Sequence, residues 1–341
     1  MDNLCHSLVG ATLSAAGFRR RTALATVTMV IGANLPDVDA IVYVADGGTT
    51  GLWFRRGWTH GVLAMIVLPF LLALFMTGVG RALDARRDRR GRAREGPPII
   101  PSQLLVVSAI SIWSHPLFDL LNTYGVRLLM PFSSRWFYGD TLFIVDPWVW
   151  LVLAIGTFMS LRRARAVPVG AGSSGVMAHA HRPARIAAAG VACYIAAMAA
   201  SAWIGRSIVE RQAVSAGGVR SLRVMVAPEP LNPYKRSVVR DMGLWYETGR
   251  FVWVPTPHYD VVGEPIVKAT NAATMTARAT ADGRRFMSWA RFPFAEVTTA
   301  GESVVVHFDD VRYARPGQRS FAGTSIVVSQ RPALTDSVRT P

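Results

Sequence analysis

Cysteine is scarce in this sequence of 341 residues, which contains only Cys5 and Cys193, both within apolar stretches. Two such cysteines provide neither a disulfide framework nor a Cys-based zinc site, so any metal site must use histidine and carboxylate ligands. The sequence also lacks a Walker loop, a dinucleotide-binding glycine fingerprint, a nucleophile-elbow serine and an HExxH pair. The common nucleotide-binding, serine hydrolase and zincin signatures are therefore missing.

The first apolar stretch has no basic segment before it, so we expect no cleavable signal peptide. Apolar residues make up 51% of the chain, which is typical of a membrane protein. A net charge of +15 is common among nucleic-acid-binding proteins. However, the arginines lie in short loops between apolar runs, a pattern that indicates membrane topology and argues against nucleic-acid binding.

The apolar runs predict a polytopic helical bundle, because a helix needs about 20 apolar residues to cross a bilayer. Five candidate spans are residues 22–44, 61–80, 99–121, 142–161 and 184–205. Residues 3–18 form a shorter sixth candidate. The loops at 19–21, 81–95 and 162–185 hold fifteen arginines, against four in the alternate loops at 46–60 and 124–140. We therefore predict that the arginine-rich loops face the cytoplasm and that the chain after residue 205 lies outside.

Beyond residue 205 the pattern changes to short β-branched or alternating runs separated by Pro, Gly and Asp. The runs at 221–226, 249–254, 303–308 and 324–329 predict a small antiparallel β-rich domain. The expected domains are a transmembrane helical domain over 1–205, an extracytoplasmic β-rich domain over 206–330 and a disordered tail over 331–341.

Six residues of metal-ligand type lie in or beside the apolar half of the chain: His6, Asp37, Asp39, His60, His115 and Asp119. An acidic side chain at the centre of an inserting helix costs roughly 2.5–3.5 kcal/mol, so several of them without a shared site would be hard to explain. With the predicted topology, all six fall toward the outer leaflet, provided that residues 3–18 also cross. We predict that four helices bring them together in the bundle core, where helical proteins often place metal sites.

Each motif also has a structural alternative. His115 and Asp119 are four residues apart, so they share a helical face and can share a cation, or simply pair with each other. The two carboxylates of NLPDVD (34–39) can be ligands or part of a turn outside the membrane. RGWTH (56–60) on its own is typical of an interfacial anchor, and His6 on its own of a cap or interfacial residue.

The tract at 122–140 is rich in aromatic residues, as expected of a membrane interface. We nevertheless predict that Asn122 and Tyr124 line a substrate pocket near His115 and Asp119, and that Asp140 takes part in catalysis. We assign catalytic roles to Asp39 and Arg56 as well, with Arg56 pairing with a substrate phosphate.

A set of His and Asp ligands without thiolate suits Zn, Mn or Fe, and bridging carboxylates would permit two ions. Such an ion lowers the pKa of a bound water and stabilises a leaving oxygen. The expected chemistry is hydrolysis of an ester or phosphoester of a lipid, or of another envelope-located substrate, at the outer face of the membrane.

These residues, in this order, resemble the membrane-bound metal-dependent hydrolases, a family that includes LexA-regulated bacterial inner-membrane hydrolases. The resemblance covers residues 1–160 and rests on five motifs: His6, NLPDVD, RGWTH, SHPLFDLLNTYG, and PFSSRWFYGD with VDPW. It implies a multi-pass protein of the bacterial inner membrane.

More distantly, the order His, Asp, His, HxxxD is similar to that of the zinc phospholipase C and single-strand nuclease superfamily. That similarity implies a helical bundle with clustered zinc, in which the metal ligands are His6, Asp37, His60, His115 and Asp119. The chain lacks a second histidine pair for a three-metal site, so one or two ions, most simply zinc, are expected. A cation-coupled transporter and a non-catalytic scaffold with a structural metal are the alternatives to a hydrolase.

Overall fold

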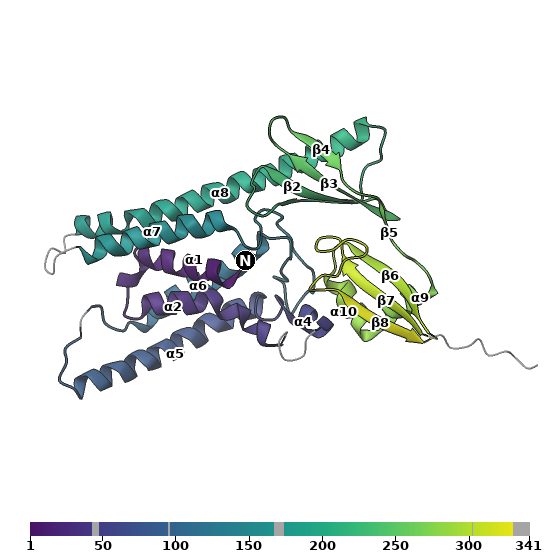
Figure 1. Ribbon diagram of the computed structural model, residues 1–341. Coiled ribbons are helices and arrows are strands. Elements are labelled where there is room, and N and C mark those ends of the chain that lie inside the picture. The colour runs from purple at the N-terminus through teal and green to yellow at the C-terminus, as the bar shows by residue number, and fades with distance from the viewer. Residues whose placement is uncertain (43–47, 95, 167–173, 302, 330–341) are drawn as a thin grey trace, which may run out of the picture.

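A computed structural model describes residues 1–42, 48–94, 96–166, 174–301 and 303–329. Helices fill one end of the molecule and two β-sheets the other (Figure 1). The predicted tail at 331–341 lies outside the described residues. Mainly helical architecture followed by a β-rich C-terminal region, as the sequence predicts, is confirmed.

The helical end consists of six longer helices and three short helical segments within the described residues. The longer helices are α1 (Asn3–Ala15), α2 (Ala25–Asn34), α5 (Val62–Asp88), α6 (Pro101–Leu120), α7 (Pro147–Arg165) and α8 (Ser174–Ser215). The short segments are η1 (Phe18–Arg20), η2 (Leu35–Asp39) and α4 (Gly48–Phe54). Carboxylates start two of the helices: Asp2 caps α1, and Asp146 caps α7 ahead of Pro147.

Four segments of the described residues are long and apolar enough to cross a membrane: Ala25–Val42, Val62–Asp88, Pro101–Leu120 and His179–Ser215. The predicted spans at 142–161 and 3–18 are not among them. With 13 residues, α1 is only about 20 Å long, shorter than the roughly 30 Å hydrocarbon core. Arginines in the last turn of α7 lower its mean hydropathy. One face of each helix packs in the bundle, where Cys5 and Val9 of α1 share a buried cluster with Val149 and Leu153 of α7.

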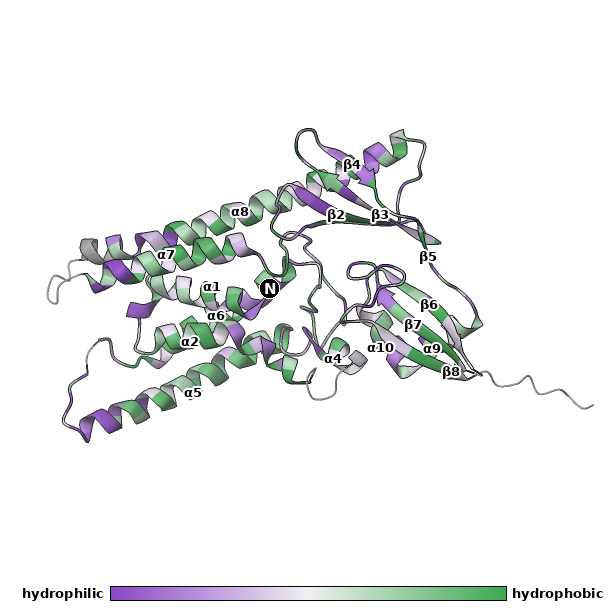
Figure 2. Ribbon diagram, in the orientation of Figure 1, coloured by the Kyte–Doolittle hydropathy of each residue, from purple (hydrophilic) through white to green (hydrophobic). Residues whose placement is uncertain are grey.

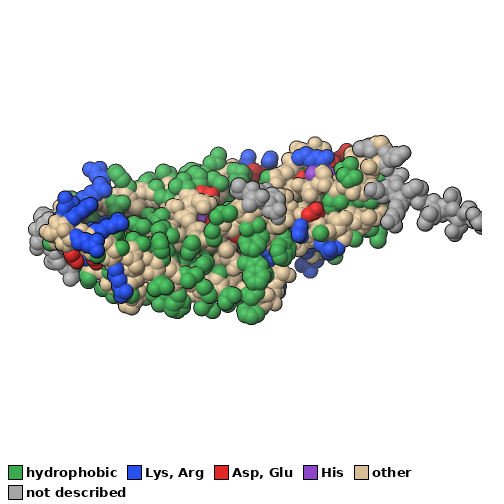
Figure 3. All heavy atoms as spheres, turned by 90° about the horizontal axis from the view of Figure 1, so that it is seen from below, with side chains coloured by type: hydrophobic (Ala, Val, Ile, Leu, Met, Phe, Trp, Pro, Cys, Tyr) green, Lys and Arg blue, Asp and Glu red, His purple; other side chains and the backbone are tan. Residues whose placement is uncertain are grey.

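Hydrophobic residues predominate along the helices (Figure 2). Their side chains form a belt on the surface, and Lys and Arg side chains gather at the end of the bundle away from the sheets (Figure 3). Large apolar side chains of α5 such as Phe70, Leu74 and Phe75 are exposed. An exposed apolar belt is stable only in a lipid environment, which supports the membrane assignment.

The first sheet is antiparallel and has five strands. Its strands are β1 (Arg223–Pro228), β2 (Lys235–Asp241), β3 (Trp245–Val252), β4 (His258–Val261) and β5 (Ile266–Val267). They lie in the order β1-β2-β3-β4, and β5 also pairs with β3. Val226, Val238 and Phe251 of this sheet pack against Val209 near the C-terminal end of α8. That helix continues to Ser215, past the domain boundary expected at residue 205.

The second sheet has three antiparallel strands in the order β6 (Pro293–Ala300), β7 (Ser303–Asp310) and β8 (Thr324–Ser329). Two short helices, α9 (Ala272–Ala279) and α10 (Ala281–Trp289), cover one face. Alternate residues of β7, namely Val304, Val306 and Phe308, enter a core shared with Phe286 and Trp289 of α10. We call β6–β8 with α9 and α10 the β6–β8 module. Its core also contains Leu52 and Tyr124 from the helical end, so it packs directly on the bundle.

Candidate metal centre

Helix α6 supplies two of the predicted ligands. His115 and Asp119 lie one turn apart on one face, with 3.5 Å between His115 Nε2 and Asp119 Oδ2. His115 Nδ1 lies 2.6 Å from the carbonyl oxygen of Ala33 in α2, to which only a protonated Nδ1 can donate. The lone pair of the histidine is therefore on Nε2, the nitrogen that faces Asp119.

The 3₁₀ segment η2 supplies Asp37 and Asp39, and the two carboxylates point to different partners. Pro36 stands at the start of η2, where its missing N–H costs no helical hydrogen bond. Asp37 Oδ1 lies 3.6 Å from His115 Nε2 and 4.0 Å from His60 Nε2. Asp39 Oδ2 instead accepts hydrogen bonds from the backbone N–H of Arg56 at 2.7 Å and from the Thr59 hydroxyl at 2.9 Å.

His60 comes from the loop before α5 and is fully buried. Its Nδ1 lies 3.4 Å from Asp39 Oδ2, and its Nε2 lies 3.4 Å from Asp119 Oδ2. His60 Nδ1 also lies 2.9 Å from the Thr59 hydroxyl, which itself donates to Asp39 Oδ2, so Thr59 and Asp39 together orient the imidazole with Nε2 directed at the cluster. Gly61 permits the loop to pack closely, since a Cβ there would lie 2.3 Å from the carbonyl oxygen of Met130.

His6 of α1, also predicted as a ligand, lies against His115 and Asp119 but is not one of the four residues whose ligand atoms converge. Its ring stacks on His115 with 3.8 Å between ring centroids, and its Nε2 lies 3.4 Å from Asp119 Oδ1. The same Asp119 oxygen also contacts Arg56 Nη2 at 3.0 Å and the amino group of Met1. The two oxygens of Asp119 thus have separate surroundings, with Oδ1 facing cationic donors and Oδ2 facing His60 and His115.

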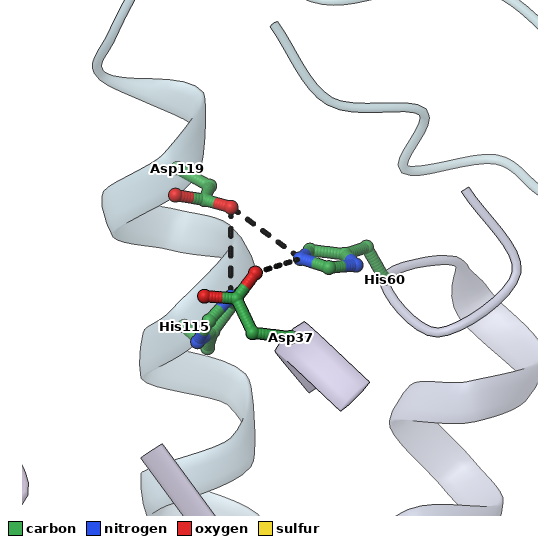
Figure 4. A group of neighbouring side chains, drawn as sticks. All are labelled: Asp37, His60, His115 and Asp119. Carbon is green, nitrogen blue, oxygen red and sulfur yellow. Dashed lines mark ion pairs between the residues drawn. The ribbon is translucent and has the colours of Figure 1, made fainter. Parts of the chain in front are cut away.

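Asp37, His60, His115 and Asp119 each place one ligand atom within 4.8 Å of the other three, and all four residues are buried (Figure 4). The structure gives no hydrogen-bond partner to Asp37 Oδ1, His60 Nε2, His115 Nε2 or Asp119 Oδ2 within the described residues. Ligands about 2.0–2.2 Å from a tetrahedral zinc ion lie roughly 3.3–3.6 Å apart. Three separations in the cluster, at 3.4, 3.5 and 3.6 Å, match this spacing, and that between Asp37 and His60 is 4.0 Å. These four residues could therefore hold a metal ion, with two neutral imidazoles and two carboxylates as ligands.

Arg56 lies beside this cluster and is almost fully buried. Its backbone is in the left-handed region, with φ of 53°, which is uncommon for a residue with a side chain. Nη1 donates to Asn122 Oδ1 at 3.1 Å, and the guanidinium lies over the Tyr124 ring at 4.7 Å. Arg56 Nε, Asn122 Nδ2 and Tyr124 Oη are buried and have no partner among the described residues.

The Tyr124 hydroxyl remains a hydrogen-bond donor at neutral pH, because burial raises the pKa of the phenol above its ordinary value of 10.0. Three neighbouring donors therefore remain free beside the ligand cluster. A substrate with anionic or carbonyl oxygens matches this arrangement.

Asp140, which the sequence predicted as a catalytic residue, contacts arginines of α8 and of the two sheet regions. Its carboxylate accepts two hydrogen bonds from Arg291 of the β6–β8 module, at 2.8 and 3.0 Å, and one from Arg206 of α8 at 2.6 Å. Its carbonyl oxygen accepts from Arg236 at 3.3 Å. These contacts connect the helical end to both sheets and give no support to a role in chemistry.

Several contributors to the site were not predicted. Thr59 holds Asp39, and Arg127 donates its backbone N–H to the carbonyl oxygen of Arg56 at 2.9 Å. Thr59 precedes His60 within the RGWTH motif, so its position in the sequence was a usable signal. Arg127 is more than 60 residues away from the loop that it supports, and no local pattern indicates that contact.

Residues 1–207 match the family described as YdjM inner membrane protein. The match covers the helical end, including every residue of the ligand cluster, and stops within α8. No curated protein and no solved structure matches the chain.

Proposed function

The chain belongs to the YdjM inner membrane protein family, and from its buried ligand cluster we propose that it is an integral-membrane, metal-dependent hydrolase of an ester or phosphoester. The observation that carries this proposal is the convergence of four unpartnered ligand atoms from three separate parts of the chain. Leaving four such atoms buried and unpaired would cost several kcal/mol, which an ion bound among them would offset.

Asp37, His60, His115 and Asp119 would hold the ion, and Asp39 would keep His60 oriented. When bound, a divalent transition metal such as zinc would acidify a water molecule and polarise the bond to be cleaved. Asp37 Oδ2 also lacks a partner, so it is available to accept a proton from the attacking water.

Arg56, Asn122 and Tyr124 would bind the substrate. Their three free donors lie together beside Asp119, and the guanidinium contributes a positive charge that favours a phosphoester over a neutral ester. The apolar belt supports a lipid or another envelope-located molecule as the source of that group.

We further propose that both sheets lie outside the cytoplasm. The support is the arginine-rich end of the bundle, which lies away from the sheets (Figure 3) and which the positive-inside rule assigns to the cytoplasm. Alkaline phosphatase fused after residue 341 should be active, whereas a fused green fluorescent protein that folds only in the cytoplasm should be dark. The reverse pattern would contradict this orientation.

Hydrolysis by the detergent-purified full-length chain tests the proposal. With added zinc, it should cleave bis(p-nitrophenyl) phosphate, p-nitrophenyl butyrate or phospholipid in mixed micelles. His115→Ala and Asp119→Ala should abolish this activity. His181→Ala is a matched control, because His181 is also buried and also bonds a helix carbonyl through Nδ1, that of Ala15.

Equal activity in the wild type and in His115→Ala would contradict the proposal. Zinc binding without cleavage of any of the three probes would contradict it as well, and would favour a scaffold with a structural metal.

A further inference from the structure

A groove between α7 and α8 lies in the half of the bundle away from the sheets, and the metal centre does not involve it. The groove has a volume of about 480 Å³. Its floor is a close helix contact, since a Cβ on Gly156 would lie 2.2 Å from Ala187 Cβ and 3.0 Å from the carbonyl oxygen of Pro183. The backbone N–H of Ala184 also donates to Ser160 Oγ at 2.9 Å, which joins the two helices beside the groove.

The walls of this α7–α8 groove are apolar and open outward. Val152, Ile155 and Met159 of α7 face Ile186 of α8. Their side chains are between 40% and 59% exposed, so they lie on the surface of the bundle. An apolar furrow on the outside of a membrane bundle is in contact with acyl chains.

The mouth of the groove is cationic. Arg163 and Arg182 line it together with His179. Neither arginine has an acidic partner among the described residues, and the sequence has no Asp or Glu anywhere between residues 147 and 209. Two guanidinium groups therefore stand beside an apolar furrow, and no carboxylate of the described residues forms an ion pair with either of them.

From this juxtaposition we infer that the α7–α8 groove is a binding site for an anionic phospholipid, with the headgroup phosphate between Arg163 and Arg182 and an acyl chain along Val152, Ile155 and Ile186. A guanidinium group binds phosphate through two parallel, charge-assisted hydrogen bonds. Basic pockets between membrane helices at the arginine-rich side are suited to anionic headgroups, whereas a zwitterionic lipid carries a cation that the two arginines repel. A free phosphate ion would match the mouth but leave the apolar walls unused.

Native mass spectrometry of the full-length chain in detergent tests this inference. Phosphatidylglycerol and phosphatidylcholine with identical acyl chains are titrated in separate samples. The wild type should retain phosphatidylglycerol roughly tenfold more tightly than phosphatidylcholine. The double variant Arg163→Gln/Arg182→Gln should lose that preference. The matched control Arg162→Gln/Arg165→Gln also removes two positive charges, both from the turn of α7 that holds Arg163 but outside the groove lining, and should keep the preference.

A second pair of variants tests the apolar part without changing charge. Val152→Trp fills the groove and should release phosphatidylglycerol, whereas Leu151→Trp, an exposed neighbour outside the lining, should not. This pair decides the matter if the arginine variants do not fold.

Equal loss in the two arginine variants would assign the preference to general surface charge and overturn the site. Retention in both Arg163→Gln/Arg182→Gln and Val152→Trp would overturn it too. Displacement of the lipid by millimolar inorganic phosphate alone would show that only the phosphate is bound and would overturn the role of the groove.

Discussion

Asp37 and Asp39 are two residues apart in one short 3₁₀ segment, but their surroundings differ. Asp37 directs unpartnered oxygens at His60 and His115, whereas Asp39 is hydrogen-bonded to Arg56 and Thr59 and lies against His60 Nδ1. The sequence predicted Asp37 as a metal ligand and Asp39 as a catalytic residue, but it gave no sign of the contacts of Asp39 with Arg56 and Thr59, because the direction of each side chain depends on the local 3₁₀ geometry.

Asp39→Asn tests the positioning role. Asparagine removes the negative charge beside His60 Nδ1 and is a weaker acceptor for the Thr59 hydroxyl that contacts this nitrogen, so we expect metal affinity to fall roughly 10- to 100-fold without complete loss. Zinc titration with a competing chelator measures this, beside Asp37→Asn, which should remove binding. Asp146→Asn is the control, because Asp146 is a buried carboxylate that accepts backbone N–H groups at α7 instead. Unchanged zinc affinity in Asp39→Asn would show that His60 is held by other means.

Arg56→Lys tests phosphate recognition. Lysine keeps the positive charge beside Asp119 but cannot present a planar fork of donors, so we expect inorganic phosphate to bind zinc-loaded protein at least about tenfold more weakly. Calorimetric titration of phosphate measures this, with zinc stoichiometry as the check that the ligand cluster is intact. Phosphate binding as tight as in the wild type would remove Arg56 from substrate recognition.

At the scale of elements, the fixed periods of helices and strands explain why the shared face of His115 and Asp119 and the positions of several strands could be predicted. The four-residue spacing of His115 and Asp119 was sufficient to place both on one face of α6. Alternation of apolar residues was sufficient to locate β1, β3, β7 and β8. The short helices α9 and α10 and the division into two sheets were missed, since these depend on packing between distant segments.

The sequence did not decide whether residues 3–18 cross the membrane. In the structure α1 is too short to span the hydrocarbon core, yet it places His6 against His115 and Asp119. Gly10 permits a close crossing of α1 and α2, because a Cβ there would lie 2.5 Å from the carbonyl oxygen of Met29 and 3.2 Å from Ala33 Cβ. Ala33 in turn supplies the carbonyl that binds His115 Nδ1. The packing of α1 on α2 is therefore coupled to the ligand geometry.

Gly10→Ala should accordingly destabilise the bundle by about 1–3 kcal/mol through overpacking, and should also weaken zinc binding. Gly78→Ala is the matched control, since Gly78 is an exposed helical glycine with nothing within 4 Å of an added Cβ. It should leave stability unchanged or raise it by up to about 1 kcal/mol. Thermal unfolding followed by tryptophan fluorescence compares them. Equal melting temperatures for the two variants would contradict the close crossing.

At the scale of the whole molecule, Arg312 joins the β6–β8 module to the bundle while it forms a buried ion pair inside the module. Arg312 binds Asp310 through Nε and Nη2, both at 2.9 Å, and its Nη1 donates to the Thr123 carbonyl oxygen at 2.8 Å just after α6. Trp289 of the same module contacts the Tyr124 ring with 5.4 Å between ring centroids. The module therefore packs against a residue of the proposed substrate pocket.

Asp310→Asn should destabilise the full-length chain by roughly 3–5 kcal/mol, because it leaves Arg312 buried without a counter-charge. Burial alone would raise the pKa of Asp310, but Arg312 lowers it below its ordinary value of 3.8. The ionised pair therefore stabilises the fold above that pH, and its contribution is lost as pH falls through the lower folded-state pKa.

Thermal unfolding between about pH 5 and pH 3 should show a steeper loss of stability in the wild type than in Asp310→Asn. Parallel pH profiles would mean that the pair does not stabilise the fold.

The central claim is that Asp37, His60, His115 and Asp119 bind a metal ion together. Elemental analysis of the detergent-purified full-length chain, dialysed to remove weakly bound ions, tests it most directly. We expect one transition-metal ion per chain in the wild type and in His181→Ala, and almost none in His115→Ala or Asp119→Ala. Metal-free wild-type protein, or equal metal content in all four proteins, would contradict the claim.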